Sequence, residues 1–395
     1  ATVDDAPVIR FVQLMITEAV KARVSDIHVE PMEKKLRIRY RIDGVCQEVN
    51  SPGKRLQGAV LSRIKIMAEM DIAEKRKPQD GRIKINAGGH DLDIRVSALP
   101  ATHGESMVMR LLDKETGLVD MEALGFHAQD HKRFQGLIKR PNGVVLITGP
   151  TGSGKTTTLY AALKQLNRPD VKIITAENPV EYNLSGINQA QVRAQIGMTF
   201  ARILRAMLRQ APNIILVGEI RDTETAEIAI QAALTGHLVF STLHTNDAPS
   251  AVTRLLDMGV KPFLVASSIQ AIMAQRLIRM LCPACKVPMK AEAAELAALG
   301  LRPQDVTGRA LFGPKGCDQC KGTGYKGRKG IFELMELDAT LRDMAFRREP
   351  TMKMRETARM NGMVTLLEDG VRKILDGLTS ISEILSITHR VDISY

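Results

Sequence analysis

The first part of the chain changes from the spacing of a helix to the spacing of strands. Apolar residues recur every three to four positions from about residue 7 to 22, which predicts an amphipathic helix with one apolar stripe. In residues 36–42 apolar side chains alternate with arginines, which predicts a half-buried strand with an arginine-rich face. Asp43-Gly44 then favours a hairpin turn, and we expect the helix to cover the resulting sheet.

The alternation continues through a second hairpin. Residues 82–96 are predicted to form two strands that turn at Ala87-Gly88-Gly89, and residues 107–112 form another strand. We therefore assign residues 1–113 to an antiparallel α+β N-terminal domain. Mixed polar residues and glycines follow in residues 114–125, which we interpret as a linker.

After Pro141 the pattern changes to short apolar runs separated by helical segments. Such runs are typical of the buried parallel strands of a doubly wound α/β sheet. Asp222 and Gly236 flank a predicted crossover helix at residues 223–235 as its N-cap and its end. The runs are residues 144–148, 173–175, 214–217 and 238–242.

Three further segments complete the predicted domain organisation. Residues 126–280 form the α/β domain. Residues 281–335 are rich in Cys, Gly and Lys and form a metal-binding subdomain, and helical spacing returns in residues 336–395. The predicted fold class is therefore α/β, with an α+β domain before it and a cysteine-containing and a helical subdomain after it.

A glycine-rich segment after the first apolar run has the spacing of a phosphate-binding loop. Gly149, Gly152 and Gly154 let the backbone curl so that its N–H groups point at phosphate oxygens. Lys155 is predicted to reach the β- and γ-phosphates and Thr156 to bind Mg²⁺, with the next helix directing its positive end at the phosphates. The predicted ATP-binding residues are Gly149, Pro150, Thr151, Gly152, Ser153, Gly154, Lys155, Thr156 and Thr157.

Polar side chains follow the later strands of the same sheet. Glu219 comes directly after an apolar run and is predicted to serve the Mg²⁺ ion. Glu177 and Glu181 follow another strand, where one of them is expected to position the attacking water; the choice of base between Glu177 and Glu219 stays open. His237 and His244 bracket a further strand and either sense the γ-phosphate or are ordinary hydrogen-bonded histidines.

Four cysteines form two Cys-x-x-Cys pairs. Four thiolates match tetrahedral Zn²⁺ coordination and leave no open position, so the predicted metal is structural. Unliganded thiols are the alternative, while redox chemistry is disfavoured because it usually needs one pair at a helix start. The predicted zinc ligands are Cys282, Cys285, Cys317 and Cys320.

The overall charge and composition narrow the classes of partner. The chain of 395 residues has a formal net charge of +11, which suits a phosphate-bearing partner, an anionic membrane surface or simple solubility. Aromatic residues make up 4% and Trp is absent, which argues against stacking on single-stranded nucleic acid. The sequence has neither a membrane-spanning apolar run nor a signal peptide, so we expect a cytosolic location. Because it begins at Ala1 without Met, we expect a piece of a longer protein.

With these motifs in place, the chain resembles the secretion ATPases of type II secretion and type IV pilus assembly almost from end to end. Asn178, Ala211 and Asn213 differ from that family, which usually carries Asp there, and the change bears on metal geometry and rate. The shared motifs are Ser-Asp-Ile-His-Val-Glu-Pro (25–31), Arg-Tyr-Arg-Ile-Asp-Gly (39–44), Lys-Pro-Gln-Asp-Gly-Arg (77–82), the phosphate loop, the Glu177 segment, Val-Gly-Glu-Ile-Arg-Asp (217–222), the histidine segment and Gly-Cys-Asp-Gln-Cys (316–320).

The resemblance implies more than the motifs do by themselves. It implies a homohexamer of two-lobed subunits, with a PAS-like N-terminal lobe, a RecA-like lobe and ATP between them. By motif position, Arg95 and Arg110 would approach the γ-phosphate. The implied role is a motor for pilin-like subunits that docks on an inner-membrane platform protein at the cytoplasmic face. A pilus-retraction motor or a nucleic-acid translocase is the alternative, and no nucleic-acid partner is expected.

Overall fold

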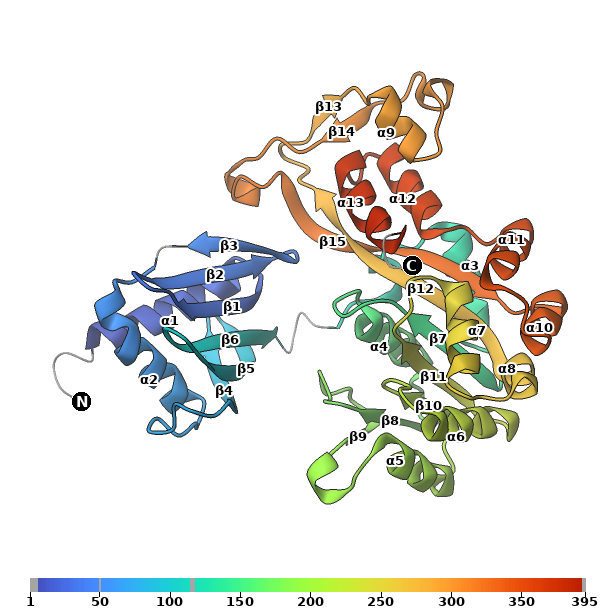
Figure 1. Cartoon of the computed structure of the whole chain (residues 1–395), viewed down its shortest axis with the longest axis horizontal. Coiled ribbons are helices and arrows are strands. Elements are labelled where there is room, and N and C mark those ends of the chain that lie inside the picture. The colour runs from blue at the N-terminus through green and yellow to red at the C-terminus, as the bar shows by residue number, and fades with distance from the viewer. Residues whose placement is uncertain (1–5, 50, 114–117, 393–395) are drawn as a thin grey trace. The chain divides into compact units, whose positions relative to one another are not determined.

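The chain folds into two compact units that divide between Leu118 and Val119 (Figure 1). This computed structural model describes residues 6–49, 51–113 and 118–392. Residues 114–117 of the predicted linker lie outside the described residues. The described end of that segment is held to the second unit, because the carbonyl of Leu124 accepts a hydrogen bond from the N–H of Gly330 at 2.8 Å.

The first unit is an antiparallel sheet with two α-helices packed on one face. Its elements are α1 (Ala6–Lys21), β1 (Val24–Pro31), β2 (Leu36–Ile42), β3 (Val45–Val49), η2 (Lys54–Leu56), α2 (Gln57–Met67), β4 (Gln79–Ala87), β5 (His90–Ala101) and β6 (Gly104–Asp113). The six strands have the order β3-β2-β1-β6-β5-β4. The apolar stripe of α1 is buried against the sheet, as Val12 and Ile16 show, so the predicted helix and α+β arrangement are confirmed.

The hairpin turns of the first unit follow from their residue types. Asp43 and Gly44 both have left-handed backbone, with φ of 49° and 87°, as a two-residue hairpin turn between twisted strands requires. Gly88 and Gly89 also have left-handed backbone, in the turn between β4 and β5. The register then places Arg37, Arg39 and Arg41 on the sheet face opposite the helices.

The second unit is built on a mostly parallel sheet (Figure 1). Its first elements are η3 (Met121–Ala123), α3 (Ala128–Leu137), β7 (Gly143–Thr148), α4 (Lys155–Leu166), β8 (Ile173–Glu177), β9 (Asn188–Gln191), η4 (Ala194–Ile196), α5 (Phe200–Met207), η5 (Leu208–Gln210), β10 (Ile214–Val217), α6 (Thr223–Leu234), β11 (Leu238–Leu243), α7 (Ala248–Asp257), α8 (Pro262–Ser268) and β12 (Ile269–Leu281). Every residue of β7, β8, β10 and β11 is buried, which confirms the four predicted parallel strands.

The cysteine-containing segment and the helical end follow in sequence. Their elements are β13 (Val287–Met289), α9 (Ala293–Ala298), η6 (Pro303–Val306), β14 (Leu311–Gly313), η7 (Asp318–Cys320), β15 (Tyr325–Glu336), α10 (Ala339–Phe346), α11 (Thr351–Met360), α12 (Leu366–Leu375) and α13 (Ile381–Asp392). The large sheet has the order β15-β12-β7-β11-β10-β8-β9, and β15 is antiparallel to β12. The sequence pattern did not predict β12 or β15. Among the described residues, no helix has both the length and the apolar character needed to cross a bilayer.

Ala211, just before β10, occupies left-handed backbone with φ of 48°. A Cβ atom is disfavoured there, whereas glycine loses entropy on folding, so Ala211→Gly is expected to stabilise the unit by roughly 0.5–1 kcal/mol. Thermal unfolding should show a melting temperature higher by roughly 1–3 °C. The matched control is Ala297→Gly, because Ala297 is exposed in helix α9 and its replacement should destabilise. Equal destabilisation by both variants would contradict the backbone argument.

Candidate nucleotide site and metal centre

The glycine-rich segment forms a loop between the carboxyl end of β7 and the first turn of α4. Gly152 and Gly154 have left-handed φ values of 80° and 86°. A Cβ atom on Gly149 would lie 2.6 Å from the carbonyl oxygen of Gln275, so the close approach of β12 requires glycine there. The helix begins at Lys155, which directs its unpaired N–H groups into the loop. The strand, loop and helix thus form an anion-binding cradle.

Lys155 lies in this cradle with its ammonium group half-buried. Its Nζ donates to the carbonyl oxygens of Gly149 at 2.7 Å and Pro150 at 3.0 Å. Burial, together with the nearby guanidinium of Arg276, lowers the pKa of Lys155 to about 8, although the carboxylate of Glu219 opposes the shift. A bound phosphate group would place a negative charge next to this ammonium and so favour its charged form.

Affinity for ATP is expected to fall as the pH rises above about 8, because Lys155 then loses its proton and bound phosphate favours the charged form. Below that pH the affinity should be flat. The dissociation constant should rise by up to about tenfold per pH unit between about pH 8 and 9.5. Equilibrium binding of ATP at a series of pH values measures this. A Lys155→Arg protein keeps its charge and should lack the slope, so an identical slope in that variant would refute the assignment.

Glu219 and His244 lie together at the carboxyl edge of the sheet. The Glu219 carboxylate is 2.8 Å from Nε of Arg221 and 3.3 Å from Nε2 of His244. Thr148, the last residue of β7, is bonded to Thr245 through their hydroxyl groups at 2.7 Å. The segment after β11 is therefore fixed to the strand that carries the phosphate loop, and Glu219 acts electrostatically on Lys155.

Glu177 ends β8 and is buried. Its carboxylate accepts hydrogen bonds from the hydroxyl of Tyr160, from Thr175 at 2.5 Å and from Gln189 at 3.1 Å. Burial and the adjacent carboxylate raise the pKa of Tyr160. These three bonds hold the Glu177 carboxylate in place, whereas Glu219 is the carboxylate that contributes to the electrostatics of Lys155. The base role of either residue stays a prediction.

The structure separates the two histidines that bracket β11. His237 lies at the amino end of the strand, where its Nδ1 is 2.8 Å from the carbonyl oxygen of Ala232. Its own carbonyl accepts from the N–H of Gly143, the first residue of β7 and thus the end away from the phosphate loop. Of the two alternatives, the structure therefore favours an ordinary hydrogen-bonded histidine for His237, and the γ-phosphate role of His244 stays a prediction.

Two of the three positions at which the family usually carries Asp lie away from the phosphate loop, because they are at the amino end of a parallel strand. Ala211 and Asn213 precede β10, whereas Glu219 follows its carboxyl end. Asn213 has a structural contact, since its Oδ1 accepts from the N–H of Lys172 at 2.8 Å. Asn178 follows β8 and is exposed. The changes at Ala211 and Asn213 therefore leave the predicted metal-binding edge intact.

Two polar residues of β12 lie next to the phosphate loop and were not found from the sequence. Gln275 donates to the carbonyl of Ser153 at 2.8 Å and accepts from the Thr158 hydroxyl at 2.8 Å. Arg276 is buried and donates to the carbonyl of Asn246 at 2.9 Å. The signal was present, because both are polar residues within the otherwise apolar run of 271–278.

Thr156, predicted to serve Mg²⁺, is exposed on the first turn of α4. Thr156 and Glu219 lie on the two elements predicted to supply metal ligands: α4 after the phosphate loop and the segment after β10. Hydroxyl and carboxylate oxygens suit Mg²⁺.

The first unit brings Arg95 and Arg110 together on neighbouring strands. They are cross-strand partners of β5 and β6, and Arg110 is in turn opposite Asp26 of β1. Nε of Arg110 donates to Asp26 at 2.9 Å, and Asp26 is buried. The two arginines belong to the sheet face opposite the helices.

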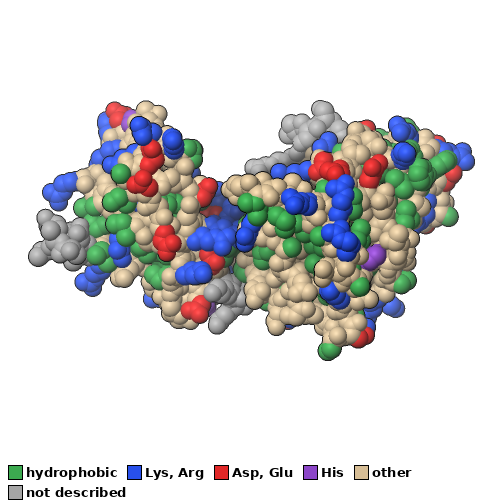
Figure 2. All heavy atoms as spheres, turned by 90° about the horizontal axis from the view of Figure 1, so that it is seen from below, with side chains coloured by type: hydrophobic (Ala, Val, Ile, Leu, Met, Phe, Trp, Pro, Cys, Tyr) green, Lys and Arg blue, Asp and Glu red, His purple; other side chains and the backbone are tan. Residues whose placement is uncertain are grey.

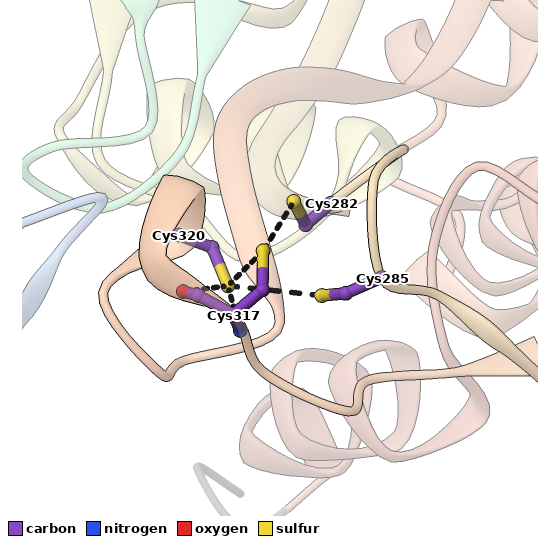
Figure 3. A group of neighbouring side chains, drawn as sticks. All are labelled: Cys282, Cys285, Cys317 and Cys320. Atoms are coloured by element: carbon purple, nitrogen blue, oxygen red, sulfur yellow. Dashed lines mark hydrogen bonds between the residues drawn. The ribbon is translucent and has the colours of Figure 1, made fainter.

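The four predicted zinc ligands converge from the loop after β12 and the loop before β15 (Figure 3). Sulfur–sulfur distances are 3.9 Å for Cys282 and Cys317, 3.8 Å for Cys285 and Cys320, and 3.7 Å for Cys317 and Cys320. A tetrahedron with Zn–S bonds of about 2.3 Å has edges of about 3.8 Å, so the cluster fits this ion. Backbone N–H groups of Cys317 and Gly324 donate to the sulfur of Cys320, as they would to a thiolate.

The fold and site together define a class. A parallel α/β unit with a phosphate loop between a buried strand and a helix, and a carboxylate on a later strand, is a P-loop nucleoside triphosphatase. The family described as Type II/IV secretion system protein matches residues 1–386. The chain belongs to this family and is an ATPase, which confirms the resemblance inferred from the motifs.

Individual relatives agree with this assignment. The chain is 51% identical over 385 residues to Type II secretion system protein E of Pseudomonas aeruginosa, covering 98% of this chain and 76% of that protein. It is 51% identical over 387 residues to the Type IV pilus assembly ATPase PilB of Myxococcus xanthus, covering 98% and 68%. The solved structure of the Legionella pneumophila ATPase DotB has a TM-score of 0.71 and 21% identity, covering 96% of this chain and 95% of that one, and supports the fold alone.

Proposed function

We propose that this chain is the motor ATPase that powers assembly of pilin-like subunits in type II secretion or type IV pilus extension. The observation that carries the proposal is the phosphate loop between β7 and α4 with the Lys155 ammonium inside it, in a chain half identical to relatives named for those two systems. In this role Mg²⁺ at Thr156 and Glu219 would neutralise the phosphates of ATP. The protein would act as a homohexamer at the cytoplasmic face of the inner membrane, docked on a platform protein.

The cysteine cluster favours assembly over pilus retraction, because the four-cysteine segment resembles that of assembly and secretion members of the family. Nucleic-acid translocation is disfavoured by the low aromatic content. Basic side chains on the face seen in Figure 2 are distributed over both units with acidic side chains among them. ATP turnover should therefore change little when DNA or RNA is added.

The proposed role is tested by deleting the gene from its own bacterium and restoring either the wild type or Lys155→Ala. Secreted proteins in the medium and pili on the cell surface are then measured. Loss of secretion or of pili that only the wild-type gene restores would support the motor role. Loss of secretion would indicate type II secretion, and loss of pili would indicate pilus extension. Unchanged secretion and piliation, together with strong salt-sensitive stimulation of turnover by DNA, would contradict it.

We further propose, from the family resemblance, that Arg95 and Arg110 are catalytic residues that act on the γ-phosphate. Arg110→Ala should then lower kcat by roughly 10³-fold, because such arginines stabilise charge that develops in the transition state. The dissociation constant for ATP should change only a few-fold. Arg10→Ala, at an exposed position of α1, is the matched control and should keep full turnover. Equal turnover in both variants would contradict this role.

A further inference from the structure

The elements around β7 indicate which end of a bound nucleotide lies on which side. Glu219 and His244 follow β10 and β11, on one side of β7 in the sheet, so the γ-phosphate end lies there. β12 is the neighbour of β7 on the other side. The phosphates occupy the loop at the end of β7. If the γ-phosphate points toward β11 and β10, the nucleoside lies on the β12 side of β7.

A cavity of about 380 Å³ lies on this side of the loop. Pro150 and Gly152 line it from the loop, Arg276 and Leu277 from β12, and Ile387 from the C-terminal helix α13. Its volume is within the range of small-ligand pockets. Its lining is mixed: Pro150, Leu277 and Ile387 give apolar surface that suits the flat ring of a nucleoside base, and the polar side chains of Thr151, Ser153, Asn246 and Arg276 complete it. No part of α13 belongs to the motifs that predicted the nucleotide site.

Two residues on one face of α13 lie opposite two residues on one face of β12. Glu383 and Ile387 are four positions apart on α13 and so share one helix face. Leu277 and Arg279 are two positions apart on β12 and so share one strand face. Glu383 meets Arg279, while Ile387 and Leu277 line the same cavity.

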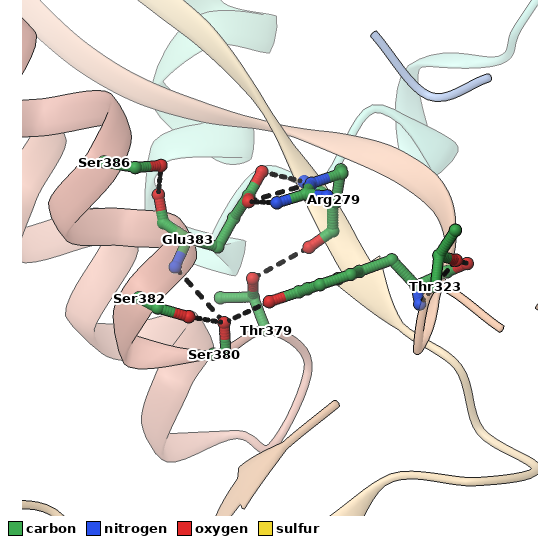
Figure 4. A network of polar contacts seen from close by, with 8 residues as sticks. Arg279, Thr323, Thr379, Ser380, Ser382, Glu383 and Ser386 are labelled. Carbon is green, nitrogen blue, oxygen red and sulfur yellow. Dashed lines mark hydrogen bonds and ion pairs between the residues drawn. The ribbon is translucent and has the colours of Figure 1, made fainter. Parts of the chain in front are cut away.

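The contact between Glu383 and Arg279 is a forked ion pair (Figure 4). Nε and Nη2 of Arg279 donate to one carboxylate oxygen at 2.9 and 2.5 Å, and the backbone N–H of Arg279 donates to the other at 2.9 Å. Glu383 is 5% exposed, so loss of the pair would leave a buried charge without its partner. This contact fixes both the position and the rotation of α13.

The start of α13 is fixed from a second direction. The hydroxyl of Tyr325 is 2.7 Å from that of Ser380, which accepts the N–H of Glu383 at 3.2 Å. The guanidinium of Arg279 lies 4.1 Å from the centre of the Tyr325 ring. Thr379 donates to the carbonyl of Arg279 at 2.8 Å. The helix is therefore held firmly along the strand that supports the phosphate loop.

On the basis of the proposed ATP site, we infer that α13 is the nucleoside-side wall of the nucleotide cavity. Ile387 contacts the base, and Glu383, which touches no nucleotide, is the positioning residue that sets Ile387 in place through Arg279. Part of the binding energy for the base thus comes from a helix that lies more than two hundred residues after the phosphate loop in the sequence.

Binding of ADP and of inorganic pyrophosphate distinguishes the two ends of the site, because pyrophosphate lacks the nucleoside. Isothermal titration with each ligand should show that Ile387→Ala weakens ADP about tenfold, the loss expected for trimming an apolar pocket wall. Pyrophosphate affinity should stay within about twofold, and Ile387→Leu should keep most of the ADP affinity. Ser386→Ala, at an exposed position of α13, is the matched control and should change neither.

Glu383→Gln should also lower the affinity for ADP relative to pyrophosphate, and adding Ile387→Ala to it should cost little more, because the two residues act through one contact. Unchanged zinc content and circular dichroism would show that the variants are folded. The inference is overturned if Ile387→Ala leaves the ratio of ADP affinity to pyrophosphate affinity unchanged. It is also overturned if the effects of the two substitutions on ADP affinity add fully in the double variant. If the wild type binds neither ligand, the proposed ATP site fails instead.

Discussion

Replacing Lys155 with alanine is expected to lower ATP turnover by roughly 10²–10³-fold, because its ammonium lies inside the phosphate loop, where it would meet the phosphate charge. The fold should survive, since Lys155 is only half-buried and its Nζ donates to two loop carbonyls. Phosphate release under saturating ATP measures the loss, and circular dichroism checks the fold.

Lys164→Ala is the matched control, because Lys164 is also a lysine of α4 and its contact is with Asp120 at the far end of the helix. It should retain wild-type turnover. Wild-type turnover in the Lys155→Ala protein would show that hydrolysis takes place elsewhere.

Loss of one cysteine is expected to have the largest effect on stability. Wild-type protein should contain one Zn²⁺ per chain, and Cys282→Ser should lose it, because a tetrahedral structural site needs all four thiolates. Structural zinc contributes roughly 10 kcal/mol or more of apparent binding energy in small domains, so the melting temperature of the second unit should fall by at least about 10 °C. Metal analysis and thermal unfolding measure the two effects.

Cys46→Ser provides the control for this substitution, because Cys46 lies on β3 of the first unit, outside the cluster. It should keep both the zinc and the melting temperature. If Cys282→Ser behaves in the same way, the four cysteines do not hold a structural metal.

Local sequence patterns predicted the elements whose signals lie within a few residues of one another. The run before Gly149, the glycines and the helix after Lys155 are contiguous, and Asp222 caps α6 by accepting from the N–H of Thr225. The cysteine spacing likewise predicted the cluster that the fold assembles.

Features that depend on pairing between residues far apart in the chain could not be predicted from the sequence. β12 is an apolar run that suits a buried helix as well as a strand, and its partner β15 begins more than forty residues later. The place of Gln275 and Arg276 next to the phosphate loop follows from the pairing of β12 with β7, which sets Ala274 opposite Thr148. The opposite positions of His237 and His244 follow from strand direction, which the parallel-sheet prediction already contained.

β12 also has a mechanical consequence. Gln275, which holds the phosphate loop, and Cys282, the first metal ligand, are separated by seven residues of continuous extended chain, about 23 Å. Pairing with β15 stiffens this stretch up to Arg279, after which the register shifts before Leu281 and the strand can bend. A pull on the metal-binding segment is therefore transmitted along an extended strand to the loop under the phosphates, with one irregular point, between Arg279 and Leu281, to absorb part of it.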